Sequence, residues 1–153
     1  IGKENRKINV KLIGDISQQL RNKIEKLARS SGHLNVRILG KLSHKETIDQ
    51  MVPGSIGIIF SYRESYSFTA LEFLAKGVPV IMYKGNDLED IYRGLKPVMF
   101  VKNEKELIKT IKNLEGRDVS ELFDMSAFKF LKDHSSWDVV IQKELDIIRS
   151  FLS

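Results

Sequence analysis

Two glutamates, Glu64 and Glu72, stand on either side of a short run of small, hydroxyl-bearing and aromatic residues. The apolar pattern around the run predicts that it leaves the carboxyl end of a buried strand at Ser61 and then enters a helix. The start of a helix exposes unpaired backbone N–H groups and a partial positive charge, which suit a phosphate. The small residues Ser65 and Ser67 let a ligand approach this backbone closely. We therefore expect a phosphate-binding loop, with both carboxylates facing one cleft from different heights.

Each of these residues also has a simpler interpretation. Thr69 and Glu72 have the spacing of a capping box, in which Glu72 only satisfies a helix amide. Glu64 is equally consistent with a solvated loop carboxylate. Tyr62 and Tyr66 flank the run, and each of them either stacks on a base or packs in the wall of the site. With eleven glutamates in the chain, about one pair at any chosen separation arises by chance.

The elements that position this run alternate between two apolar periodicities. Short, mostly apolar runs indicate buried strands at residues 8–13, 35–40, 55–60, 78–83 and 98–101. Apolar residues that recur every three or four positions indicate helices at 16–27, 43–51, 68–76, 87–93, 104–114, 120–131 and 136–152. Strands separated by helices pair in parallel, with helices on both faces. The sequence thus predicts an α/β fold with an open, doubly wound parallel sheet.

Ligands of such a sheet bind at the carboxyl ends of its strands. The loops at that edge are expected at residues 14–15, 40–44, 61–67 and 84–87. Two helix starts carry local capping patterns: Asp15 with Gln18 resembles a capping box, and Ser43 is expected to cap the helix that follows it. Gly77 is expected to end the helix that contains Glu72.

The composition excludes several kinds of site. The chain has no cysteine, and its histidines, His33, His44 and His134, lack the spacing of metal ligands, so we expect no metal site. No apolar run approaches the ~18 residues that span a bilayer, and no signal-peptide pattern opens the chain. We therefore expect a soluble, cytoplasmic protein.

The net charge of +5 suits anionic partners such as nucleotides, nucleic acid or a membrane surface. The basic residues are nevertheless spread from Lys3 to Arg149, which favours a solvated surface over a binding patch. Binding of nucleic acid rests on the high pI alone, and we do not expect it.

The segment that starts at Glu64 resembles the donor-site signature of the family 4, or group 1, glycosyltransferases, which are retaining enzymes of the GT-B fold. Seven residues separate Glu64 from Glu72, and the similar run continues as Phe73-Leu74-Ala75-Lys76-Gly77-Val78-Pro79-Val80-Ile81. Further similar motifs come in the family's order: a strand ending in Gly14-Asp15, the turn Gly40 to Ser43 followed by Glu46, a strand ending in Ser61, and Ser136-Trp137-Asp138. The resemblance covers nearly the whole chain and implies the Rossmann-like C-terminal half of a GT-B enzyme.

The resemblance implies a role for each matching residue. Glu64 would be the catalytic residue beside the transferred sugar, and Glu72 would hold the ribose hydroxyls. Backbone N–H groups of the loop would bind sugar hydroxyls and phosphate oxygens, and the turn at Gly40 would border the base. The implied donor-binding residues are Glu72, Ser65, Tyr66, Ser67, Phe68, Gly40, Lys41, Leu42 and Gly14.

The same resemblance implies the partners. The substrate would be a nucleotide diphosphate sugar, used without a bound metal or other cofactor, and the product would carry the hexosyl group with retained anomeric configuration. The acceptor would be a saccharide or a lipid-linked saccharide, bound through an N-terminal domain that this chain is expected to lack. Peripheral contact with the inner face of a membrane is a further expectation.

The chain departs from the family pattern in two places. The family has an aromatic residue and a glycine where this chain has Tyr66 and Ser67, and serine adopts positive φ less freely. The family's arginine and lysine, which clamp the diphosphate, belong to a strand–helix unit that would precede this chain, and neither Arg63 nor Lys84 matches them. Two alternatives therefore stay open: a non-catalytic nucleotide-binding module of the same fold, and a nucleotide-sugar epimerase of the GT-B fold.

Overall fold

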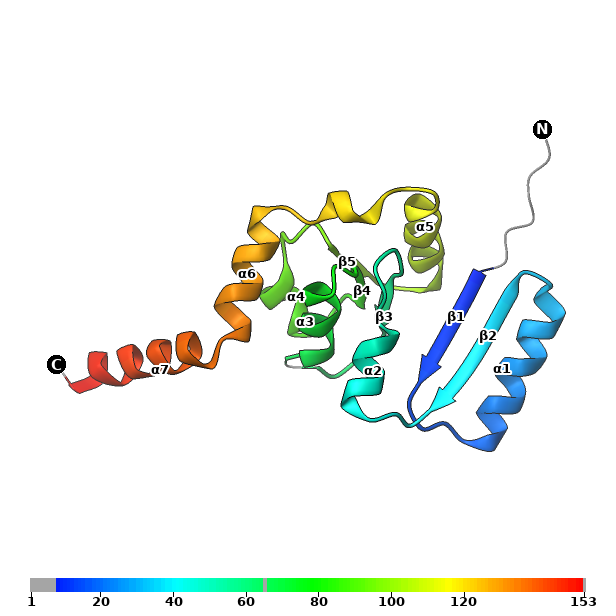
Figure 1. Ribbon diagram of the computed structural model, residues 1–153, viewed down its shortest axis with the longest axis horizontal. Helices are drawn as coiled ribbons and strands as arrows, with labels where there is room; N and C mark the ends of the chain where they lie inside the picture. Colours follow the sequence, from blue (N-terminus) through cyan, green and yellow to red (C-terminus); the bar gives the residue numbers. More distant parts are fainter. Residues whose placement is uncertain (1–7, 65, 153) are drawn as a thin grey trace. The chain divides into compact units, whose positions relative to one another are not determined.

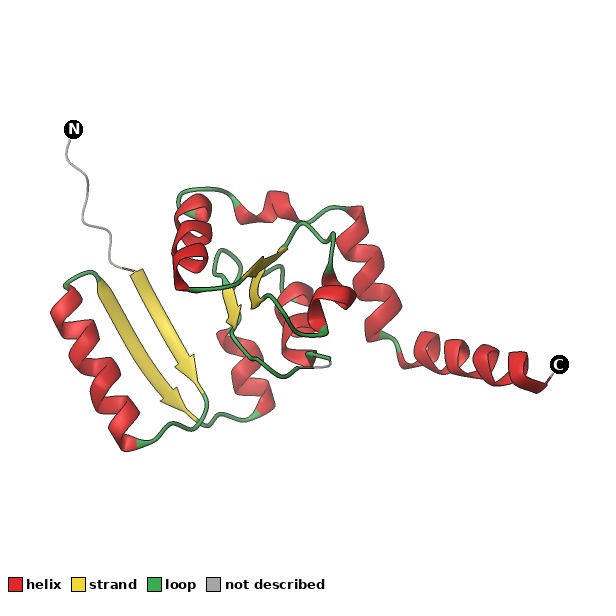
Figure 2. Cartoon of the chain, turned by 180° about the vertical axis from the view of Figure 1, so that it is seen from behind, coloured by secondary structure: helices red, strands yellow, loops and turns green. Residues whose placement is uncertain are grey.

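Strands and helices alternate along the chain in the predicted order, and all strand pairs are parallel (Figures 1 and 2). The computed structural model describes residues 8–64 and 66–152. The chain divides into two units, Ile1–Gln50 and Met51–Ser153, which are treated one at a time. The predicted parallel α/β fold is confirmed within both of them.

The first unit contains β1 (Ile8–Ile13), α1 (Gln18–Ser31), β2 (Leu34–Gly40) and α2 (His44–Gln50). Its two strands form a parallel pair, with a register shift between Leu12 and Ile13. Helix α1 begins later than predicted, because Ser17 and not Asp15 is its N-cap: the Ser17 Oγ accepts the Leu20 N–H at 3.3 Å. The predicted box of Asp15 and Gln18 is therefore wrong.

The start of α2 matches its prediction. The Glu46 carboxylate accepts the Ser43 N–H at 2.8 Å, and the Glu46 N–H donates to the Ser43 Oγ at 3.3 Å. This reciprocal pair is a complete capping box. The hydrogen bonds from Ser43 also lower the pKa of the Glu46 carboxyl.

The second unit begins with a three-stranded sheet, ordered β3 (Gly57–Ile59), β4 (Val80–Tyr83) and β5 (Val98–Val101). Its helices are α3 (Phe68–Ala75), α4 (Leu88–Tyr92), α5 (Glu104–Leu114), the 3₁₀ turn η1 (Val119–Leu122), α6 (Met125–Ser135) and α7 (Trp137–Leu152). The helix predicted over 120–131 is thus two elements. Asp124 interrupts it by accepting the N–H groups of Ser126 and Ala127 as the N-cap of α6.

The core of the second unit lies on both faces of β4, whose residues Val80, Ile81 and Met82 are fully buried. Val80 and Met82 pack with α3 and α4, whereas Ile81 packs with Leu114 of α5. Because successive strand residues point to opposite faces, helices cover both sides of this strand. The doubly wound arrangement follows from that burial.

Helix α3 approaches β3 closely at Gly57. Gly57 is buried in β3, and a Cβ atom on it would lie 2.8 Å from the ring of Phe73. Glycine is therefore required by space here, since any side chain would push the helix away from the strand.

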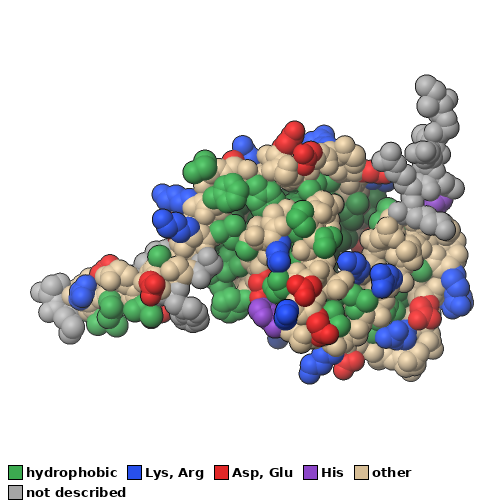
Figure 3. Space-filling view, viewed as in Figure 1, with side chains coloured by type: hydrophobic (Ala, Val, Ile, Leu, Met, Phe, Trp, Pro, Cys, Tyr) green, Lys and Arg blue, Asp and Glu red, His purple; other side chains and the backbone are tan. Residues whose placement is uncertain are grey.

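The last helix, α7, follows α6 after one residue and exposes a series of apolar side chains (Figure 3). The exposed residues are Ile141, Leu145, Ile147, Ile148 and Phe151. Among the described residues, no helix is both long and apolar enough to cross a membrane.

Candidate functional site

An open cavity of about 410 Å³ lies at the carboxyl ends of β3 and β4. Two loops line it, both of which the sequence places at the binding edge of the sheet. The lining residues are Tyr62, Arg63, Glu64, Gly85, Asn86 and Asp87. The volume falls within the range of ~300–1,000 Å³ that is usual for small-molecule sites.

Asn86 joins the two loops. Its Nδ2 donates to the carbonyl oxygen of Ser61 at 2.8 Å, and its Oδ1 accepts the N–H of Leu88 at 3.2 Å. One side chain thus holds the loop after β3 against the loop after β4 and also accepts the N–H of the first residue of α4. Sequence reasoning did not identify this contact, which joins residues 25 positions apart.

Glu64 lies in the wall of the cavity, where the sequence places a candidate catalytic carboxylate. Within the described part of the chain, no hydrogen bond or ion pair engages the side chain of Glu64 or that of Asp87 across the cavity. Both carboxylates are therefore available to accept hydrogen bonds from a ligand that carries hydroxyl groups.

Ser67 starts α3 with an ordinary backbone conformation. Its φ of −107° is extended, so the site does not need the positive φ that glycine favours. The Ser67 Oγ accepts the Ala70 N–H at 3.3 Å, and the residue is 2% exposed. Since Ser67 is the N-cap, Thr69 lies inside the first turn, and the capping box proposed for Thr69 and Glu72 is wrong.

Tyr92 stabilises the start of α3 through a hydrogen bond to Ser67. It is fully buried, and its hydroxyl donates to the Ser67 carbonyl oxygen at 3.0 Å. Burial, with the nearby Tyr66 and Glu64, raises the pKa of Tyr92 well above its usual range. The sequence offers one signal for such a contact, because a tyrosine on an apolar helix face needs a partner for its hydroxyl.

Tyr66 belongs to the wall of the core. Its hydroxyl donates to the His134 carbonyl oxygen at 3.3 Å, its ring meets that of Phe68 at 5.2 Å, and burial raises its pKa. Of the two interpretations, wall packing is the one that these contacts favour. Its neighbour Ser65 lies outside the described residues.

Tyr62 differs from Tyr66. It is 68% exposed and lines the cavity. Its ring centroid lies 4.5 Å from that of Tyr83, which in turn lies 5.3 Å from that of Phe60. An aromatic cluster of Phe60, Tyr62 and Tyr83 therefore supports one side of the cavity.

Glu72 does not line this cavity. It lies half-buried on α3 and has an interaction of its own within the chain. The cavity therefore contains one of the two glutamates of the motif, and the role of Glu72 toward a ribose stays a prediction.

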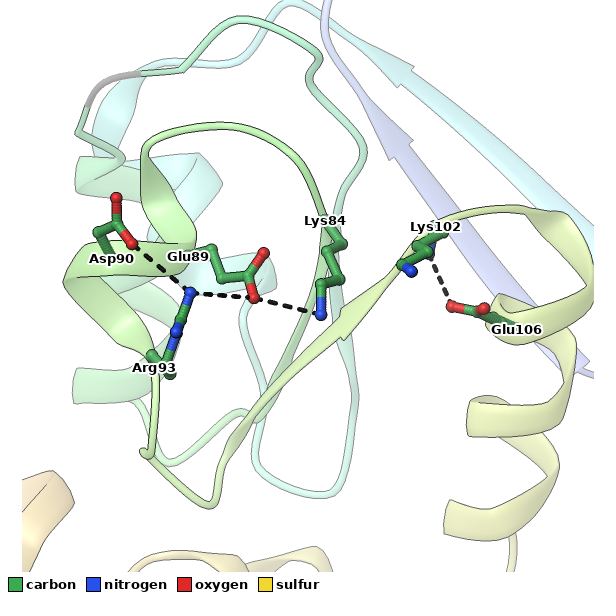
Figure 4. A network of polar contacts seen from close by, with 6 residues as sticks. All are labelled: Lys84, Glu89, Asp90, Arg93, Lys102 and Glu106. Carbon is green, nitrogen blue, oxygen red and sulfur yellow. Dashed lines mark hydrogen bonds and ion pairs between the residues drawn. The ribbon is translucent and has the colours of Figure 1, made fainter.

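Lys84, the first residue after β4, is engaged in an ion-pair network (Figure 4). Its Nζ lies 3.3 Å from the Glu89 carboxylate, which also meets Arg93 at 3.3 Å, and Arg93 meets Asp90 at 3.6 Å. Because Glu89 is largely shielded and shared by two cations, Lys84 is held toward α4 in this arrangement.

The predicted residues of the first unit gather where β1 and β2 end. The Gly14 N–H donates to the Gly40 carbonyl oxygen at 2.8 Å. Both glycines have positive φ, at 130° and 71°, which a side chain would strain. Lys41 is exposed and Leu42 half-buried in the turn that follows.

In the described residues, no group of three histidine, aspartate or glutamate side chains is placed to hold a metal ion. The charged residues that line the cavity are two carboxylates, Glu64 and Asp87, and one arginine, Arg63. The arrangement is suited to hydrogen bonding with a polar organic ligand.

Solved structures share this fold. A glycosyltransferase from Rickettsia africae matches 98% of the chain with a TM-score of 0.69 at 20% identity, and the match covers 41% of that protein. For a sucrose-phosphate synthase from Thermosynechococcus elongatus, the match covers 93% of this chain and 38% of that one, with a TM-score of 0.61 at 17% identity. For a chain of the GtfA/B complex, the match covers 97% of this chain and 37% of that one, with a TM-score of 0.56 at 13% identity.

No family model matches the sequence, and no curated protein is similar enough in sequence to count as a relative. The chain spans about two-fifths of the length of the solved chains that it matches. The structural likeness establishes the fold, which is the Rossmann-like α/β fold of the C-terminal half of GT-B glycosyltransferases.

Proposed function

We propose that the chain is the nucleotide-sugar-binding domain of a retaining glycosyltransferase. The whole protein would transfer a hexosyl group from a nucleotide diphosphate sugar to a saccharide or a lipid-linked acceptor. Glu64 would lie beside the transferred sugar, and Glu72 would hold the ribose. The backbone of Gly14, Gly40, Lys41 and Leu42 would serve the nucleotide.

The observation that carries this proposal is the position of Glu64. The motif predicted a carboxylate at the carboxyl end of a sheet strand, and Glu64 lines an open cavity at the ends of β3 and β4. In a doubly wound sheet, this is the edge at which ligands bind. The shared fold supports the same interpretation.

The start of α3 supports a phosphate in the same loop. Amides of a first helical turn have no intrahelical acceptor, and the helix dipole favours an anion beside them. Ser67 satisfies the Ala70 N–H, while Tyr92 holds the Ser67 carbonyl in place. The turn is thus fixed before a ligand arrives, which reduces the entropy lost on binding.

Ligand-observed NMR tests the proposal. The chain is mixed with UDP, GDP and ADP and with UDP-glucose, GDP-mannose and ADP-glucose at millimolar concentration. We expect selective binding of one nucleotide and its sugar conjugate, and Glu72→Gln should weaken both at least about tenfold, since a charge-assisted hydrogen bond contributes ~1.5–3 kcal/mol.

The matched control is Glu144→Gln, which removes the charge of an exposed glutamate on α7. It should leave nucleotide affinity unchanged, and circular dichroism checks that both variants keep the fold. Unchanged affinity in a folded Glu72→Gln variant would reject the ribose role. Absence of binding by every nucleotide and conjugate would reject the proposed function.

A further inference from the structure

Resting on the proposed function, we infer that Tyr62 is the stacking platform for the transferred sugar and that Glu64 and Asp87 bind hydroxyl groups of the same ring. Tyr62 would thereby determine how strongly the hexosyl part of the donor is held. No motif of the resemblance assigns a role to Tyr62 or to Asp87.

The first observation is the exposure and support of the Tyr62 ring. A tyrosine that is 68% exposed is free to take many orientations unless something holds it. Tyr83 meets its ring at 4.5 Å with an interplanar angle of 61°, and Phe60 meets it at 6.4 Å and 86°. These T-shaped contacts orient the ring, while most of its surface stays exposed and part of it lines the cavity.

The second observation is the polarity of the remaining wall. Glu64 and Asp87 supply carboxylate oxygens, which only accept hydrogen bonds, and Arg63 supplies one positive charge against their two negative charges. This net negative lining suits the uncharged, hydroxyl-bearing part of a donor rather than its phosphates. An apolar aromatic face beside carboxylates fits a hexose ring, which carries C–H groups on its faces and hydroxyl groups around its rim.

The third observation is how firmly the two walls are joined. The Asn86 Nδ2 donates to the Ser61 carbonyl at 2.8 Å, directly before Tyr62, and Asn86 itself precedes Asp87. The platform and the second carboxylate are therefore held by one hydrogen bond. A preformed arrangement of this kind loses less entropy when a sugar binds.

The test compares each nucleotide sugar with its own free nucleotide. NMR titration of the whole chain with UDP and UDP-glucose, and with the GDP-mannose and ADP-glucose pairs, gives the ratio of the two dissociation constants. We expect Tyr62→Ala to reduce the preference for the conjugate by about two- to tenfold, the range of a single aromatic contact. Tyr62→Phe should retain the preference, because the ring remains.

Phe151→Ala is the matched control, since it removes an 84% exposed aromatic ring on α7 that does not line the cavity. Saturation-transfer NMR gives a second readout. The saturation transferred from the protein to the C–H protons of the sugar should fall in Tyr62→Ala and persist in Tyr62→Phe and Phe151→Ala. Asp87→Asn should reduce the preference for the conjugate in the same direction as Tyr62→Ala.

Three results would overturn the inference. If conjugates bind but Tyr62→Ala leaves the preference unchanged, the ring does not contact the sugar, and the proposed function stands. If Tyr62→Ala weakens the nucleotide and its conjugate by the same factor, the ring contacts the nucleotide instead. If no conjugate and no nucleotide binds the unaltered chain, the inference fails together with the proposed function.

Discussion

The contact between Tyr92 and Ser67 makes a sharp prediction about the stability of the helix start. Tyr92→Phe removes a hydroxyl that donates to the Ser67 carbonyl at 3.0 Å and leaves the buried ring in place. The carbonyl keeps two other donors, the N–H groups of Ala70 and Leu71 at 3.1 and 3.3 Å. No acceptor is left unsatisfied, so the loss should be that of one net hydrogen bond, about 0.5–1.5 kcal/mol.

Urea unfolding, followed by far-UV circular dichroism, measures this loss in free energy. Amide hydrogen exchange at Ala70 and Leu71 shows whether the effect lies at the start of α3. Tyr66→Phe is the control, because its hydroxyl bond is longer, 3.3 Å, and only partly buried, so it should cost less. A loss above about 3 kcal/mol in Tyr92→Phe would mean that a polar group is orphaned, and no loss would mean that the bond contributes nothing.

The pH dependence provides an independent check with a definite sign. Burial raises the pKa of Tyr92 above the ordinary value of 10.0, so the folded state favours the protonated phenol. The resulting contribution to stability is complete below pH 10 and is lost as the pH rises above it toward the higher pKa of the folded state. The unaltered chain should therefore lose stability more steeply above pH 10 than Tyr92→Phe does. If the stability of the two proteins falls equally steeply above pH 10, the raised pKa of Tyr92 is refuted.

Three further changes have expected outcomes. Gly57→Ala places a Cβ 2.8 Å from the ring of Phe73 and should destabilise the chain by about 1–3 kcal/mol, which urea unfolding measures. Ser67→Ala should cost about 1 kcal/mol through loss of the N-cap, and Ser67→Gly only a few tenths, with equal losses contradicting the capping role. Hydrogen bonds from Ser126 and the ion pair with Lys96 lower the pKa of Asp124, so its contribution to stability is present above pH 3.8 and is lost as the pH falls below that value. In Asp124→Asn, the free energy of unfolding should therefore fall less steeply as the pH is lowered below 3.8. The same fall in the variant and the unaltered chain would contradict this.

The order of the elements could be predicted from the sequence, because apolar periodicity is a property of neighbouring residues. The sheet edge that carries the cavity followed from the same reasoning, since parallel strands align their carboxyl ends. The prediction that Ser43 caps α2 was also correct, although the reciprocal hydrogen bond from the Ser43 N–H to Glu46 was not predicted. In each case, the signal lay within a few residues of the feature that it predicted.

Predictions failed where two local candidates competed. Ser17 and not Asp15 caps α1, and Ser67 and not Thr69 caps α3, since in each case the serine side chain accepts an N–H of the first helical turn. Asp124 likewise split a helix whose apolar periodicity continued across it.

Long-range contacts were beyond the reach of local patterns. The hydrogen bonds of Tyr92 with Ser67 and of Asn86 with Ser61 each join residues 25 positions apart. Neither partner carries a motif that names the other. The support of the helix start and the joining of the cavity walls therefore became visible only in the folded chain.

The order of strands in the second unit has a consequence for how the protein folds. Strands β3, β4 and β5 lie side by side in the order in which they occur along the chain. The connections through α3 and α4 join strands that are neighbours along the chain. Little chain entropy is therefore lost before β4 gains both of its partner strands. During synthesis, these strands leave the ribosome in the same order as their order in the sheet. The sheet beneath the cavity can therefore grow strand by strand during synthesis, without waiting for a distant segment to return.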